Sequence, residues 1–228
     1  GIVKGPFNFY KRVHKWTKGD GGEKQYTPYE KIVPRMEHVS CWDFFPDPTA
    51  TSIEDAEYVI QRHRLNKSQF RALINLPFFD AVAIENCVAK GPNYEDKYYE
   101  DTIREDETEA NYQENRFEVL EYWGVLDAQL AKATGLDIAD SMSDLEQVQI
   151  NAWICNGMVL RCVLNPFTPA RIPYQVVPYE VNPYQMFGIG VAENMEDSQM
   201  LMNGHVRMAI DNLALAGNLV FDVDEASL

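Results

Sequence analysis

The stretch VAENMEDSQMLMNGHVRMAIDNLALA, residues 191–216, decides how this chain is organised. It contains no proline and most of its residues favour helix, so it predicts one continuous helix. At a rise of ~1.5 Å per residue, such a helix is ~39 Å long. Gly217 follows it and can supply the left-handed conformation that commonly ends a helix.

The predicted helix carries two apolar stripes instead of the single stripe of a surface helix. At ~100° per residue, the first stripe consists of Met195, Met202, Val206, Ala209 and Leu213. The second stripe, roughly 140° away, consists of Leu201, Met208 and Leu215. The remaining side carries Glu193, Asn203, Arg207 and Asp211. Two interpretations stay open: a helix buried between two layers of one domain, or a helix held between identical neighbours in a ring, with its polar side facing a lumen.

The chain before this helix is dominated by strand patterns joined by short turns. Residues 5–18 and 23–33 are expected to form one hairpin, and Asn156-Gly157 favours a second. The other expected elements are strands at 57–65 and 116–123 and helices at 66–76, 79–89 and 128–133. We therefore predict an α+β fold, with a mixed or antiparallel β-sheet, peripheral helices and one long C-terminal helix.

The composition is that of a globular protein with a strongly acidic balance. The 228 residues include 20 Lys and Arg against 35 Asp and Glu, a net charge of −15, and 46% of them are hydrophobic. This balance argues against a protein that wraps nucleic acid tightly, but not against DNA that passes without binding. Residues 1–39 hold eight basic and four acidic residues, and residues 90–150 hold five and sixteen, an asymmetry that can orient the chain in an assembly.

Sequence motifs of catalysis, metal binding and cofactor binding are absent. The four histidines lack the spacing of a metal site, the four cysteines form no CxxC pair, and no apolar run approaches the ~20 residues that span a bilayer. No cofactor is expected. The best enzymatic candidates are Glu118 and Glu121 beside Tyr122-Trp123, because two carboxylates suffice for glycoside hydrolysis. A carbohydrate-active or other hydrolase using this acidic, Tyr/Trp-rich region therefore stays open as an alternative function, and so does a binding module with a helical arm that forms no ring.

Three stretches carry a family resemblance. Residues 39–50 read VSCWDFFPDPTA and precede IEDAEYV at 53–59, which suggests a strand end, a DFxxDPxA turn and an acidic turn before the next strand. Residues 178–221 run from an extended Pro/aromatic segment into the long helix, and FEVLEYW lies between, at 117–123. These stretches resemble the portal proteins, or head-to-tail connectors, of tailed bacteriophages, in particular those of short-tailed phages.

The resemblance implies a structural subunit, without an active site, of a homo-oligomeric ring at one vertex of the capsid in the virion. Such rings are commonly dodecamers that form the channel for DNA translocation, in viral genome packaging by a separate terminase and in ejection. Capsid and scaffold proteins and a tail adaptor would be further partners. Assembly would take place in the host cytoplasm, and no membrane is implied. Both apolar stripes would contact sister copies, and Asn203, Arg207 and Asp211 would face the channel.

The same resemblance implies a division of the chain. Residues 1–180 would form a wing-like α+β domain, residues 181–217 the stem helix region and residues 218–228 the start of the clip. The polar segment at 124–146 departs from the family pattern. A second stem helix and most of the clip are not represented, and the chain begins with Gly1, so we expect a piece of a longer protein.

Overall fold

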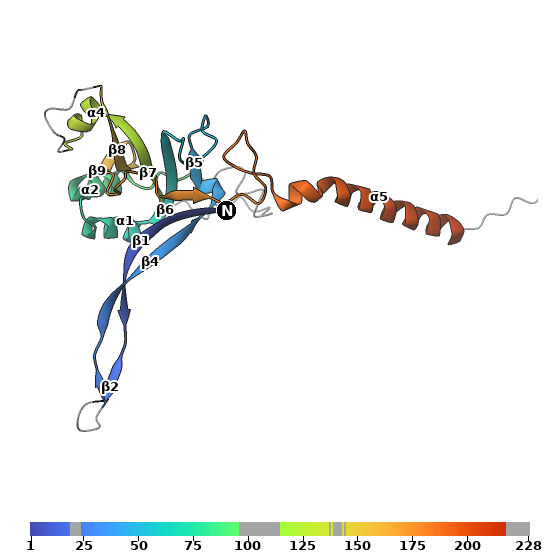
Figure 1. Ribbon diagram of the computed structural model, residues 1–228, viewed down its shortest axis with the longest axis horizontal. Coiled ribbons are helices and arrows are strands. Elements are labelled where there is room, and N and C mark those ends of the chain that lie inside the picture. Colours follow the sequence, from blue (N-terminus) through green and yellow to red (C-terminus); the bar gives the residue numbers. More distant parts are fainter. Residues whose placement is uncertain (19–23, 96–114, 137, 139–142, 144, 218–228) are drawn as a thin grey trace, which may run out of the picture. The chain divides into compact units, whose positions relative to one another are not determined.

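The computed structural model describes residues 1–18, 24–95, 115–136, 138, 143 and 145–217 (Figure 1). The chain divides into two units. The first comprises Gly1–Val177 with Tyr184–Met186, and the second comprises Pro178–Pro183 with the chain from Phe187 onward. The expected clip segment at 218–228 lies outside the described residues.

An antiparallel sheet of five strands forms the centre of the first unit. Its strands, which follow one another in space as in the sequence, are β5 (Phe44–Pro46), β6 (Tyr58–Asn66), β7 (Arg116–Asp127), β8 (Gln147–Cys155) and β9 (Met158–Leu164). Asn156 and Gly157 join the last two strands with φ angles of 52° and 73°, the left-handed pair that a two-residue hairpin turn requires. The predicted hairpin and the α+β class are thus confirmed.

Short helices cover both faces of this sheet, and all but the first lie at positions that the sequence predicts. They are η1 (Cys41–Asp43), α1 (Lys67–Ala72), η2 (Leu73–Asn75), α2 (Ala81–Lys90) and α4 (Ala128–Ala133). Asn66 begins α1 with a reciprocal capping box to Gln69. Phe70 of α1 and Ile84 of α2 pack with Phe117 on one face of the sheet, and Ala131 of α4 packs with residues of β8 on the opposite face.

A second sheet is built on the N-terminal hairpin, in the order β10-β1-β4, from β1 (Ile2–Val13), β4 (Tyr29–Val39) and β10 (Tyr174–Val176). The register of β1 against β4 shifts between Lys4 and Phe7, and the β10 partners end at Lys4. Gly5 lies at this shift with φ 122°, and a Cβ there would come within 2.9 Å of the Arg35 carbonyl oxygen. Beyond it, β1 and β4 continue as a two-stranded ribbon into β2 (Trp16–Lys18) and β3 (Lys24–Tyr26) (Figure 1). The predicted hairpin is confirmed, with a return strand that runs on to Val39.

The second unit contains α5 (Val191–Gly217), one unbroken helix of 27 residues. Glu180 and Ile189 pair as an isolated bridge before it, and the Asn194 side chain donates a hydrogen bond to Glu180 at 2.5 Å. The prediction of a continuous helix is confirmed, with its end one residue later. No residue of α5 is buried by its own unit among the residues that the structure describes, so both interpretations of the two stripes stay predictions.

Candidate functional site

The DFxxDPxA turn holds a loop to the five-stranded sheet. Asp43 accepts hydrogen bonds from Arg62 and Arg64 of β6, each at 2.9 Å. Asp47 accepts hydrogen bonds from the Thr49 hydroxyl at 2.7 Å and the Thr49 backbone amide at 2.9 Å, and these bonds lower the pKa of Asp47. Both acids of the motif are therefore engaged in hydrogen bonds that stabilise the fold.

The Glu121 carboxylate lies in a buried polar cluster on one face of β7. Glu121 is 2% exposed and accepts hydrogen bonds from Lys4 at 2.5 Å, from His63 at 2.7 Å and from Trp123 at 2.7 Å. Asn151 of β8 adds a longer contact at 3.4 Å. The cluster ties β1 of the N-terminal hairpin to the centre of the five-stranded sheet.

The charges of this cluster determine the protonation of Glu121. Burial by itself raises the pKa of a carboxyl group, but the hydrogen bond from His63 and the charges of Lys4 and His63 outweigh it and lower the pKa of Glu121 to about 2. Glu121 is therefore ionised at neutral pH and fully engaged by its donors. A carboxylate in this state is suited to holding strands together, and not to donating a proton in catalysis.

The proposed carboxylate pair of a hydrolase is not brought together. Glu118 and Glu121 are three residues apart on β7, and side chains alternate along a strand, so the two carboxylates point to opposite faces of the sheet. Glu118 lies 4.0 Å from Arg62, on the face opposite the Glu121 cluster. Among the described residues, Glu118 and Glu121 therefore do not form the carboxylate pair that glycoside hydrolysis requires.

Both apolar stripes of α5 are exposed to solvent. Their large side chains are 52% to 73% exposed, and Ala209 is exposed as well. This range covers Met195, Leu201, Met202, Val206, Met208, Leu213 and Leu215. Such a run of exposed large apolar side chains along one helix is unusual for the surface of a soluble monomer.

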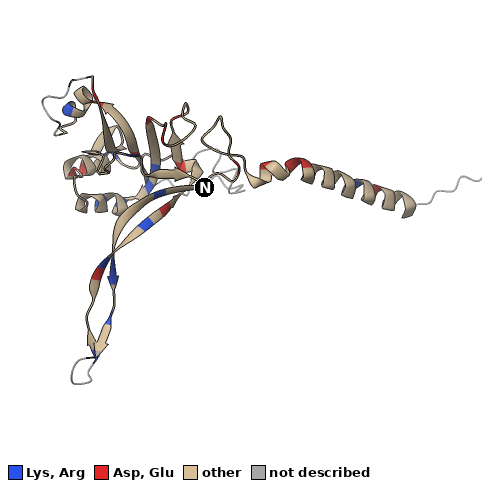
Figure 2. Ribbon diagram, in the orientation of Figure 1, with Lys and Arg blue, Asp and Glu red and all other residues tan. Residues whose placement is uncertain are grey.

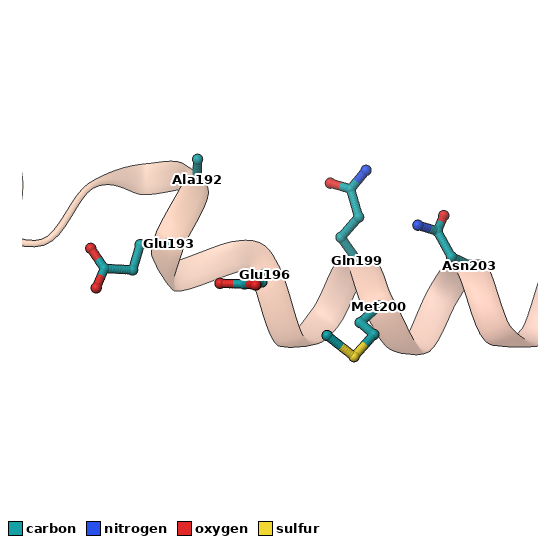
Figure 3. Close-up of a pocket in the computed structure, with 6 residues that line it drawn as sticks. All are labelled: Ala192, Glu193, Glu196, Gln199, Met200 and Asn203. Atoms are coloured by element: carbon teal, nitrogen blue, oxygen red, sulfur yellow. The ribbon is translucent and has the colours of Figure 1, made fainter. Parts of the chain in front are cut away.

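The polar side of α5 offers a surface without a ligand site. Figure 3 shows its first turns, where a surface hollow is lined by Ala192, Glu193, Glu196, Gln199, Met200 and Asn203. These side chains come from one helix, and no second element of the described chain lines the hollow. Asn203, Arg207 and Asp211 continue the polar side toward the C-terminus of α5, and all three are exposed.

The N-terminal hairpin is an exposed surface that sequence reasoning missed. Trp16, Met36 and Tyr10 are each 65% exposed, and further aromatic residues along both strands are exposed too. Figure 2 shows Lys and Arg distributed along the same ribbon. One sequence signal could have indicated this exposure. Aromatic and basic residues occur on both faces of these strands, whereas a sheet packed against a core has one apolar face and one polar face.

The described residues include no candidate metal site, and their two buried cysteines are kept in the protonated thiol form. Among them, no three His, Cys, Asp or Glu side chains come together as ligands of a metal ion, and no helix has the length and apolarity needed to cross a bilayer. Cys87 and Cys155 are buried free thiols. Burial raises the pKa of both, that of Cys155 to about 12, which keeps them protonated and unreactive.

A protein-family model described as Phage SU10 portal protein matches residues 15–227. The chain belongs to the SU10 portal protein family. The match runs from the N-terminal hairpin through the five-stranded sheet and all of α5, so it covers far more than the three stretches that carry the resemblance. No curated protein matches the chain. The predicted portal resemblance is confirmed, and the portal family is a structural family.

Proposed function

We propose that this chain is a structural subunit of the ring at the portal vertex of a phage capsid, and that α5 is a stem helix of the channel. The observation that carries the proposal is a 27-residue helix with two exposed apolar stripes and a third side on which polar and charged residues predominate, beside Met200 and Ile210. A neighbour on each flank covers both stripes, and the polar side then remains for the lumen. The oligomer interface comprises Met195, Leu201, Met202, Val206, Met208, Ala209, Leu213 and Leu215.

Ring geometry accounts for the difference between the two stripes. In a closed ring each subunit presents one surface to the next copy and a different surface to the previous copy. The stripe of Met202 on one copy therefore meets the stripe of Met208 on its neighbour, and the two need not be alike. Fully burying a large apolar side chain contributes roughly 1.5–3 kcal/mol, so about seven half-exposed side chains supply a substantial driving force for association.

The charge of α5 suits a channel that DNA passes through. The helix carries Glu193, Glu196, Asp197 and Asp211 against a single Arg207. Strong DNA binding is driven by basic side chains that neutralise phosphates and release their counterions. A helix with more acidic than basic side chains lacks this driving force, so double-stranded DNA moves past without being held. The channel-facing residues in this arrangement are Asn203, Arg207 and Asp211.

The remaining assignments follow from the same proposal. Residues 1–180 form the wing, 181–217 the stem region and 218–228 the start of the clip. The ring has twelve copies, sits in the virion after assembly in the host cytoplasm, and links the capsid to the tail. A terminase, capsid and scaffold proteins and a tail adaptor are its partners in packaging and ejection.

Paired substitutions on adjacent residues of α5 test the interface. Met202→Asp places a charge in the first stripe, and Asn203→Asp places the same charge on the polar side, with the same effect on net charge. Electron microscopy and native mass measurement of the full-length protein should show rings for Asn203→Asp and loss of rings for Met202→Asp. Rings of normal stability in Met202→Asp would overturn the interface. Helix content by circular dichroism confirms that both variants are folded.

A further inference from the structure

The hairpin beyond the Gly5 irregularity is an arm with its own surface. We call residues 7–18 and 24–36 the hairpin arm. From Phe7 to Trp16 it extends over ten residues, or roughly 30 Å at ~3.3 Å per residue. Its residues 7–13 pair only with β4 among the described strands, and β2 and β3 form a sheet of two strands. Two-stranded ribbons are marginally stable alone in water, so a long one favours a partner that covers it.

The base of the arm is fixed to the first unit by buried contacts, so the arm is preorganised for docking. Ile2 and Lys4 are 2% and 6% exposed, and Lys4 forms the buried ion pair with Glu121 at 2.5 Å. The arm therefore leaves a fixed base in a defined direction within its unit. A preorganised element loses less conformational freedom on association than a loose chain does.

The surface of the arm combines apolar and basic side chains. Its exposed large apolar residues are Phe9, Tyr10, Trp16, Tyr26, Tyr29, Ile32 and Met36. Lys11 lies directly opposite Lys31 in the register, and Lys18 lies opposite Lys24. Like charges in directly opposed positions destabilise a strand pair. Carboxylates brought by a partner would relieve this repulsion, so the partner is acidic.

The charge of the chain itself identifies that partner. Residues 1–39 carry a net charge of +4 and the whole chain carries −15, so the remaining residues of each copy carry −19. The aliphatic side chains of Ile32 and Met36 suit a protein surface better than stacked bases. We propose that the hairpin arm docks onto an acidic surface of a neighbouring copy of this chain. This inference rests on the proposed ring, which brings copies side by side.

Charge reversal on the arm tests the docking. The double variant Lys11→Glu/Lys31→Glu keeps a like-charged pair in the same register, so the repulsion within the ribbon is retained and only the sign changes. The control Lys67→Glu/Lys90→Glu makes the same change of net charge at two exposed lysines that lie outside the arm. In the full-length protein, subunit association should weaken at least about tenfold in the Lys11/Lys31 variant, because carboxylates then face carboxylates across the contact. Association of the control should stay within about twofold of wild type.

Crosslinking shows where the arm lies. Rings are assembled from ¹⁴N- and ¹⁵N-labelled copies and treated with a carbodiimide, which joins lysine amines directly to carboxylates. We expect mixed-isotope crosslinks from Lys11 or Lys31 to Asp or Glu. Rings that yield such crosslinks only within one copy, or whose stability is unchanged by the Lys11/Lys31 variant, overturn the docking and leave the ring proposal intact.

Two further outcomes also decide the question. A wild-type protein that stays monomeric refutes the ring and the docking together. Binding of a DNA duplex that the Lys11/Lys31 variant loses, with association between copies unchanged, shows that nucleic acid and not a second copy occupies the arm. Fluorescence anisotropy of a labelled duplex measures this outcome directly.

Discussion

Replacement of Glu121 by glutamine should destabilise the first unit far more than a surface substitution does. Glu121→Gln keeps the shape of the side chain but leaves the ammonium group of Lys4 buried without its counter-charge. Removing one partner of a buried ion pair costs about 3–5 kcal/mol. Lys4→Met should cost less, because Glu121 keeps His63 and Trp123 as donors at 2.7 Å. The double variant should be more stable than the sum of the two losses predicts, because neither charge of the ion pair is then left buried without the other.

The pH dependence gives an independent estimate of the same contribution. The pKa of Glu121 is lowered from 4.5 to about 2, so its ionisation stabilises the folded state above pH 4.5, and this contribution is lost as the pH falls toward 2. A shift of this size corresponds to about 3 kcal/mol. Urea denaturation at pH 7, 5 and 3 should therefore show a difference between wild type and Glu121→Gln that shrinks as the pH falls below 4.5. A difference under about 1 kcal/mol at pH 7 would refute the reasoning.

Two other substitutions test the packing of the five-stranded sheet. Gly124→Ala should lower the free energy of unfolding by about 1–3 kcal/mol, because its Cβ would come within 2.6 Å of the Glu57 carbonyl oxygen. A melting temperature equal to that of wild type would contradict this contact. Phe70→Ala should lower the free energy of unfolding by about 3–5 kcal/mol, because the ring is fully buried and stacks on Phe117, with the two ring centroids 4.7 Å apart. Urea denaturation measures this loss, and a change below about 1 kcal/mol would show that the site collapses without penalty.

Local signals account for the parts of the fold that the sequence predicts well. Asn156-Gly157 specifies a left-handed turn, and Asn66 with Gln69 specifies a helix start, each through neighbouring residues alone. The long helix at 191–217 is predicted for the same reason, because composition and the absence of proline act along the chain itself. Element boundaries then differ by only a few residues.

Distant pairing accounts for what the sequence does not reveal. Glu121 is buried because Lys4, 117 residues away, lies against it, and nothing around β7 signals this partner. The same limit applies to the hairpin arm: its strands are recognisable in the sequence, but the point at which β10 stops pairing with β1, at Lys4, is not. The roles of the α5 stripes depend on other copies of the chain, so they remain predictions.

Electron cryomicroscopy of the full-length protein tests the central claim most directly. The account predicts closed rings around an open channel, in which α5 of each copy lies between two others, with the Met202 stripe against one neighbour and the Met208 stripe against the other. Particles without a ring, or rings in which α5 packs against its own subunit and leaves its neighbours uncontacted, would contradict it.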